Sequence, residues 1–137
     1  MSDLQESNKQ VVRRFNKEFI EDQNDAVFNE IVSPDFNDHS GDGHGGAQGA
    51  FFFFTQMFRP AFPDAKVVIH DLIAEGDKVV THKSYQGTNR GDFMGMPASG
   101  KPVTIDVIEI LRLSDGKYVE HSAIMDTASL MQQLQGA

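Results

Sequence analysis

The fold is decided by residues 103–113, whose sequence is VTIDVIEILRL. β-branched and aliphatic residues dominate this run at a spacing of two, which is typical of a β-strand. Residues 114–117, SDGK, predict a hairpin turn, so residues 118–125 are expected to form the antiparallel partner strand. A helix is predicted from Asp126 to residue 134, because apolar side chains then recur at helical spacing.

Upstream of this hairpin the chain predicts two more strands. A period of two begins after Pro63-Asp64 and ends at the turn formed by residues 75–77. Residues 78–87 form the next predicted strand, and residues 91–102 form a long loop rich in glycine, methionine and proline. The second half of the chain is therefore expected to be an antiparallel meander.

The first half predicts helices. Apolar residues recur at helical spacing over residues 8–20 and 26–32, and a polar glycine-rich loop covers residues 37–46. Residues 47–60 form a third helix with phenylalanines on every side, which predicts a position inside the fold or under a partner. Helices followed by a meander predict an α+β fold, and a length of 137 residues fits one domain spanning residues 1–137.

Composition excludes several function classes. The net charge is −8, from 12 basic and 20 acidic residues, which argues against a nucleic-acid partner and against docking on anionic lipid. The chain has no cysteine, so disulfides, thiolate nucleophiles and cysteine-bound metals are excluded. We find no signal-peptide pattern and no apolar run of about 18 residues, and we expect a soluble cytoplasmic protein with no membrane partner.

Three stretches carry a family resemblance. Residues 91–103, GDFMGMPASGKPV, form a loop and the start of a strand, and residues 115–121, DGKYVEH, are followed by Asp126 and by LMQQL at residues 130–134. Residues 34–36, PDF, precede His39. Taken in their order along the chain, of which they cover nearly the whole length, these stretches resemble the SnoaL-like polyketide (ester) cyclases of the nuclear transport factor two-like superfamily.

The resemblance implies a cone-shaped, curved antiparallel sheet wrapped around N-terminal helices, with a short C-terminal helix and an apolar pocket in its mouth. It also implies pairing of sheets into a homodimer. Founding members of the family close a ring by intramolecular aldol condensation without metal or organic cofactor. They use an acidic residue two positions after the histidine that matches His121, and this position is Ala123 here.

Strand periodicity identifies Glu109 as the first candidate catalytic residue. It shares a strand face with Ile105, Val107, Leu111 and Leu113, so a cavity on that face would desolvate its carboxylate and raise its pKa. The alternative is that Glu109 turns outward and pairs with a lysine across the strand.

Three further residues are candidates for the site. His121 either enters the same cavity or is a core histidine with a structural partner. Asp126 either faces the pocket or caps the C-terminal helix. His39 either holds a ligand oxygen at the pocket mouth or is a solvated loop residue. His82 and Tyr85 face opposite sides of their strand, so at most one of them enters the pocket.

We expect no metal site. Asp38, His39, Asp42 and His44 lie together in the polar loop, but their mixed spacing is weak evidence for metal ligation. Together with these candidate residues, the resemblance implies a cofactor-free, small-molecule enzyme that performs acid/base chemistry next to a carbonyl, either ring closure or isomerisation. Its partner would be an apolar or aromatic carbonyl compound. The alternatives are a binding protein for an apolar metabolite and a scaffold dimer with an empty pocket.

Overall fold

The computed structural model describes residues 3–39 and 46–135. These residues form helices, two π-helical segments (η1 and η2) and a sheet. Along the chain the elements are α1 (Asp3–Arg14), η1 (Phe15–Glu21), α2 (Asp25–Ile31), β1 (Val32–Asp38), α3 (Gly46–Phe52), η2 (Phe53–Phe58), α4 (Arg59–Ala61), β2 (Lys66–Glu75), β3 (Lys78–Thr88), β4 (Pro102–Ser114), β5 (Lys117–Met125) and α5 (Thr127–Leu134). None of the helices in the described ranges is long and apolar enough to cross a membrane.

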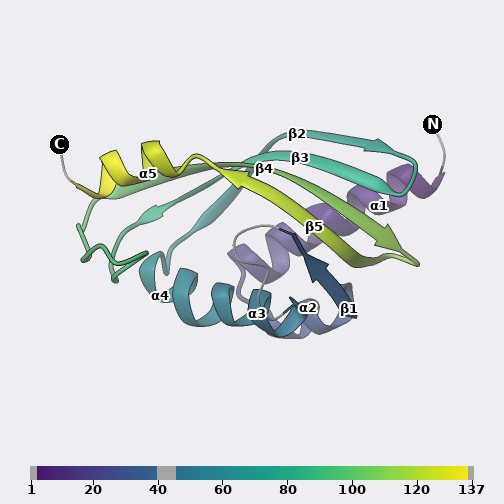
Figure 1. The fold of residues 1–137 in the computed structure, drawn as a ribbon, viewed down its shortest axis with the longest axis horizontal. Helices are drawn as coiled ribbons and strands as arrows, with labels where there is room; N and C mark the ends of the chain where they lie inside the picture. The colour runs from purple at the N-terminus through teal and green to yellow at the C-terminus, as the bar shows by residue number, and fades with distance from the viewer. Residues whose placement is uncertain (1–2, 40–45, 136–137) are drawn as a thin grey trace.

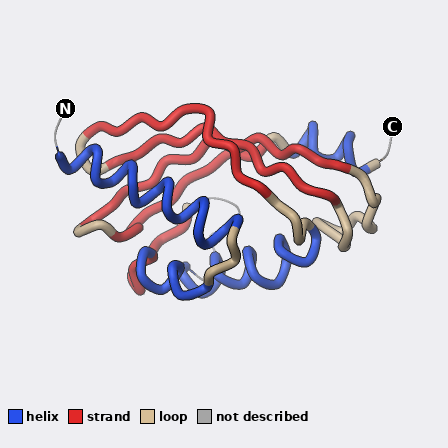
Figure 2. The backbone as a smooth tube through the Cα atoms, turned by 180° about the vertical axis from the view of Figure 1, so that it is seen from behind, coloured by secondary structure: helices blue, strands red, loops and turns tan. Residues whose placement is uncertain are grey.

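The predicted α+β architecture is confirmed. The five strands lie in the order β1-β5-β4-β3-β2, and β2 to β5 form the expected antiparallel meander. The sheet curves over the helices that run from α2 to α4 (Figure 1). Seen from behind, α1 crosses the sheet, where it contacts β2 and β3 (Figure 2). The short helix α5 contacts β4 at the far end of the molecule.

Strand β1 is the one element that the sequence pattern does not predict. It pairs parallel with β5 at the edge of the sheet, so the sheet is mixed and not wholly antiparallel. Pro34 lies within β1, and an edge strand tolerates proline because one side of its backbone needs no partner in the sheet. The β1–β5 register sets Asp38 opposite His121.

Strand β4 alternates as its sequence predicts. Its odd-numbered residues from Val103 to Leu113, Glu109 among them, are buried, whereas Ile108 and Ile110 on the other face are 53 % and 44 % exposed. The concave inner face of the sheet therefore carries the core, together with one carboxylate.

The helix formed by α3, η2 and α4 is not covered on all sides within the described chain, so its predicted position inside the fold is wrong and the alternative, a position under a partner, stays a prediction. Phe58 is buried, but Phe52 is 57 % exposed and Met57 is 41 % exposed. One side of the helix covers the open side of the sheet, and no further element of the described chain lies over its other side (Figure 1). Phenylalanines on all sides therefore do not place this helix in the interior.

Candidate functional site

A cavity of about 440 Å³ lies between the inner face of the sheet and the helices. Its walls are mainly aromatic and aliphatic, and a few charged side chains interrupt them. The lining residues are Phe15, Phe28, Val32, Phe36, Asp38, Gly49, Ala50, Phe53, Phe54, Lys83, Tyr85, Val107, Glu109, Leu111, Tyr118, His121, Ala123, Met125 and Thr127. An apolar cavity with a few converging polar groups is typical of a small-molecule site.

Glu109 and Lys83 form an ion pair in the wall of this cavity. The Lys83 ammonium lies 2.9 Å from Glu109 Oε2, and the two side chains are only 2 % and 7 % exposed. Lys83 also donates to Asn16 Oδ1 over 2.7 Å. Asn16 is buried in the π-helical segment η1, and such segments often occur at functional sites.

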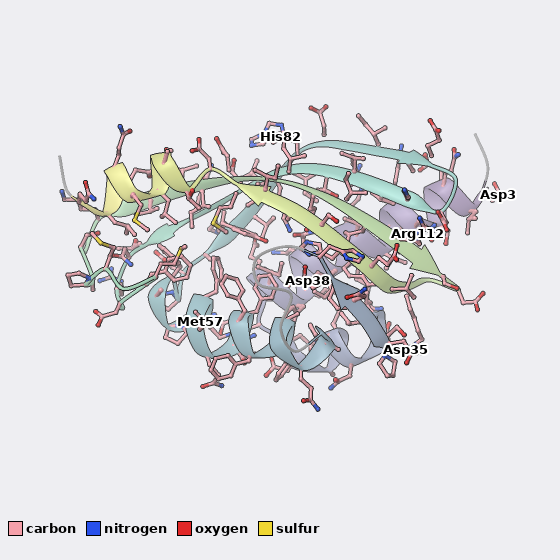
Figure 3. The ribbon with its side chains drawn as sticks, viewed as in Figure 1. Asp3, Asp35, Asp38, Met57, His82 and Arg112 are labelled. Atoms are coloured by element: carbon pink, nitrogen blue, oxygen red, sulfur yellow. The ribbon has the colours of Figure 1, made fainter. Side chains whose placement is uncertain are left out.

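His121 joins Glu109 to a second carboxylate. Its Nε2 lies 2.9 Å from Glu109 Oε1, and its Nδ1 lies 3.0 Å from Asp38 Oδ1. Asp38 comes from the end of β1, and Figure 3 shows it between the sheet and the helix layer. Four charged groups from four strands thus form one continuous hydrogen-bonded chain, Asp38–His121–Glu109–Lys83.

The electrostatics of this chain reverse the predicted pKa shift of Glu109. Burial alone raises the pKa of this carboxyl, but the positive charge of Lys83 and the hydrogen bond from His121 outweigh it and lower the pKa to about 2. For His121, burial lowers the pKa, but hydrogen bonds to Asp38 and Glu109 outweigh burial and raise it to about 9. At neutral pH the site therefore holds an ionised Glu109 beside a protonated His121.

Glu109 and His121 are the two candidates that the structure brings together in the cavity. His39 does not line it, and its imidazole approaches Glu120 at 3.8 Å with 48 % of the side chain exposed. Asp126 caps α5, since its Oδ1 accepts a hydrogen bond from the Ser129 backbone N–H over 3.0 Å. The helix-cap alternative for Asp126 is therefore the one observed.

The structure also shows which of the two candidate side chains on β3 faces the cavity. Tyr85 lines the cavity, whereas His82 lies on the opposite, outer side of the sheet (Figure 3). Asp42 and His44 lie outside the described residues. Within the described ranges no three histidine, aspartate or glutamate side chains are grouped so that they could hold a metal ion.

Sequence reasoning missed three site residues. Lys83 has the same strand parity as Tyr85, so an inward Tyr85 is the signal that would have placed it in the wall. Asp38 falls in the polar, glycine-rich stretch that predicts a loop, whereas the structure places it at the end of β1, opposite His121. Tyr118 was missed because β5 carries a bulge: Leu113 pairs with Tyr118 but Arg112 pairs with Glu120, which puts Tyr118 and His121 on one face.

The chain was compared with known protein families and solved structures. The family model for SnoaL-like polyketide cyclases matches residues 10–134. A protein from Jannaschia sp. CCS1, provisionally named a SnoaL-like polyketide cyclase, is 26 % identical, with a TM-score of 0.89 over 100 % of this chain and 97 % of that one. A provisionally named polyketide cyclase from Bacillus cereus is 28 % identical, with a TM-score of 0.79 over 94 % of this chain and 80 % of that one. Among curated proteins no sequence matches.

A further neighbour with a similar fold carries a different provisional name. AclR from Streptomyces galilaeus, provisionally named a hydroxylase, is 24 % identical, with a TM-score of 0.86 over 97 % of this chain and 83 % of that one. At this identity the likeness concerns the fold alone. The chemistry has to be argued from the residues in the cavity.

Proposed function

The chain belongs to the SnoaL-like polyketide cyclase family, and we propose that it is a small-molecule enzyme that moves a proton next to a ligand carbonyl, without metal or organic cofactor. The observation that carries the proposal is the Asp38–His121–Glu109–Lys83 chain in an otherwise apolar cavity. An ionised carboxylate and a protonated imidazole side by side are the base and the acid that enolisation of a ketone requires.

Space for a ligand exists beside Glu109. Ala123 is the residue directly opposite Glu109 on β5, and both residues line the cavity. Family members carry an acidic residue at this position, so the methyl group of Ala123 leaves room that a longer side chain would fill. Glu109 is thus the carboxylate nearest to the position of the missing acid.

The ion pairs of Glu109 set a condition on the chemistry. They keep the carboxylate ionised, but a pKa of about 2 makes it a weak base at neutral pH. A ligand carbonyl that accepts the Nε2–H bond of His121 removes that bond from Glu109 and so raises the basicity of Glu109. His121 is 19 % exposed and Lys83 only 2 %, so the His121 contact is the one that a ligand reaches.

The reaction then proceeds within the site. Glu109 takes a proton from the carbon next to the carbonyl, the C–H electron pair forms the enolate double bond, and the oxygen gains negative charge opposite the His121 imidazolium. Asp38 holds the imidazolium in place through Nδ1. Attack of the enolate on a second carbonyl of the same ligand would close a ring, which is the aldol cyclisation implied by the family.

Deuterium exchange tests this proposal without knowledge of the natural substrate. β-Tetralone is a planar, largely apolar ketone with acidic hydrogens next to its carbonyl. Its exchange in heavy water, followed by proton NMR, is expected to be accelerated by the protein. Glu109→Gln should lower the rate by about 10²–10⁴-fold, as loss of a general base does. His39→Gln, outside the cavity, is the matched control and should leave the rate unchanged.

The alternative function is a binding protein for an apolar metabolite. It is favoured by Ala123 and by the fact that both Glu109 oxygens already have charged partners. Binding of β-tetralone with no acceleration of exchange by the wild-type protein would support this alternative and contradict the catalytic proposal.

We further propose that the protein forms a homodimer through the outer face of its sheet. A groove on this face is lined by Ile108, Ile110 and Ile124, and Ile124 is 79 % exposed. A cluster of exposed isoleucines on a sheet face is typical of an interface.

A further inference from the structure

We propose that the Tyr118 hydroxyl is a second hydrogen-bond donor to the ligand oxygen, beside His121, and that it selects ligands with a carbonyl or enolate oxygen at that position. The inference rests on the proposed function for its catalytic part only. Its binding part stands on the geometry of Tyr118, which the proposed function does not use.

The position of Tyr118 follows from the bulge in β5. In a regular strand, residues three apart face opposite sides, so Tyr118 would point outward if His121 points inward. The additional residue at the bulge, Val119, brings both side chains to the inner face. Tyr118 and His121 therefore occupy consecutive inward positions on one strand, opposite Leu113 and Leu111 of β4.

The Tyr118 hydroxyl is buried without a partner. The residue is 3 % exposed and lines the cavity, and its hydroxyl oxygen has no hydrogen-bond partner among the residues that the structure describes. The ring packs with its centroid 4.8 Å from that of Phe15, which fixes its direction. Buried hydroxyls nearly always have a partner, so an orphaned one in a cavity wall points to a ligand atom.

The chemistry of the hydroxyl defines that ligand atom. Burial, and then the negative charge of Glu109, raise the pKa of Tyr118 well above its usual range, so the phenol stays neutral and donates. Its acceptor must be an oxygen of an otherwise apolar ligand, because the surrounding walls are aromatic and aliphatic. A donor aimed at an enolate oxygen gains strength as charge develops there, and this favours the enolate over the ketone.

The test compares Tyr118→Phe with a control variant outside the cavity. Tyr85, the other tyrosine of the chain, also lines the cavity and its phenol interacts with Lys83 of the site, so the control is His39→Gln, which lies outside the cavity. The probes are β-tetralone and tetralin, which have the same bicyclic carbon skeleton with and without the carbonyl oxygen. Calorimetry gives the dissociation constants, and infrared spectroscopy gives the carbonyl stretching frequency of bound β-tetralone.

Tyr118→Phe should weaken β-tetralone binding about three- to tenfold, as expected for one neutral hydrogen bond, and leave tetralin binding unchanged. The carbonyl frequency of bound β-tetralone should lie lower in the wild type and in His39→Gln than in Tyr118→Phe. The melting temperature of ligand-free Tyr118→Phe should equal or exceed that of the wild type, because an unpaired buried hydroxyl is removed.

Equal carbonyl frequencies in wild type and Tyr118→Phe would overturn the inference, and so would a clear fall in melting temperature, which would indicate a structural partner for the hydroxyl. These readouts do not depend on catalysis. If deuterium exchange is absent while the frequency shift depends on Tyr118, the proposed reaction fails and the donor role of Tyr118 stands.

Discussion

Replacing Lys83 by methionine should destabilise the protein strongly at neutral pH. Methionine keeps most of the length of the side chain but removes the ammonium. Glu109 Oε2 then loses a partner at 2.9 Å, and the amide oxygen of Asn16 loses one at 2.7 Å. Both residues are almost fully buried, at 6 % exposure for Glu109 and 1 % for Asn16, so water replaces the lost ammonium only in part.

The expected loss in the free energy of unfolding is about 3–5 kcal/mol, the range found when one partner of a buried ion pair is removed. His121 still contacts Glu109 Oε1, so the carboxylate keeps one positive neighbour. In the background of Glu109→Gln, the same Lys83→Met change should cost far less, because it then removes a buried ammonium that has already lost its charged partner.

Urea unfolding at pH 7, followed by circular dichroism, measures these differences through the shift of the midpoint. The control is Lys78→Met at the exposed start of β3, which should lie within about 0.5 kcal/mol of the wild type. The gap between Lys83→Met and wild type should shrink as the pH falls below about 4.3, because protonation removes the unpaired charge of Glu109 in the variant.

A loss below about 1 kcal/mol, or an equal cost of Lys83→Met with and without the Glu109 carboxylate, would refute the reasoning, because it would show that the pair is solvated or absent. The lowered pKa of Glu109 also means that the ionised carboxylate stabilises the fold, so Glu109→Gln should reduce stability at pH 7.

Three other predictions follow from the site and the sheet. The free energy of unfolding should be highest between about pH 4.3 and pH 6.5 and should fall on both sides. The contribution of Glu109 is present above its unfolded pKa of about 4.3 and is lost as the pH falls toward 2. The contribution of His121 is present below its unfolded pKa of about 6.5 and is lost as the pH rises toward 9. Thermal melts across pH should show this, and His121→Gln should flatten the alkaline side; an unchanged alkaline slope would contradict the His121 assignment. Light scattering at micromolar concentration should give a dimer mass that Ile124→Lys halves and that Leu4→Lys, on α1, leaves intact; a wild-type monomer would exclude the interface. Binding of β-tetralone should be unaffected by EDTA, and a loss that one divalent ion restores would show that a metal takes part.

The sequence predicts the parts of the site that depend on one regular strand. Alternation along β4 places Glu109 among buried aliphatic residues without any knowledge of its neighbours. The direction of its pKa shift depends on Lys83 and His121, which lie on other strands. Strand pairing, and not local pattern, determines those contacts, so the sequence alone led to the wrong direction.

Irregular strand pairing explains why the sequence did not indicate two other residues of the site. Asp38 lies on an edge strand with sparse pairing, and Tyr118 lies before a bulge that reverses the alternation of β5. Neither the edge pairing of β1 nor the bulge in β5 is marked by a glycine or another recognisable residue pattern at that position. The sequence also leaves open whether His82 or Tyr85 of β3 faces the cavity, because the adjacent Val79 and Val80 place a valine on each face of that strand.

The Lys83–Glu109 ion pair also has a consequence for the assembly of the sheet. In the native register, Lys83 pairs with Val107 and Glu109 pairs with Thr81, so the two charges are diagonal neighbours. A slip of β4 against β3 by two residues keeps every apolar side chain on the inner face, and hydrophobic burial alone discriminates poorly against it. The slip in one direction, however, separates the ammonium and the carboxylate by about 7 Å more and buries the Lys83 ammonium without a charged partner. The ion pair thus disfavours this shifted register of β3 and β4 during folding, which the alternating pattern of the two strands alone would allow.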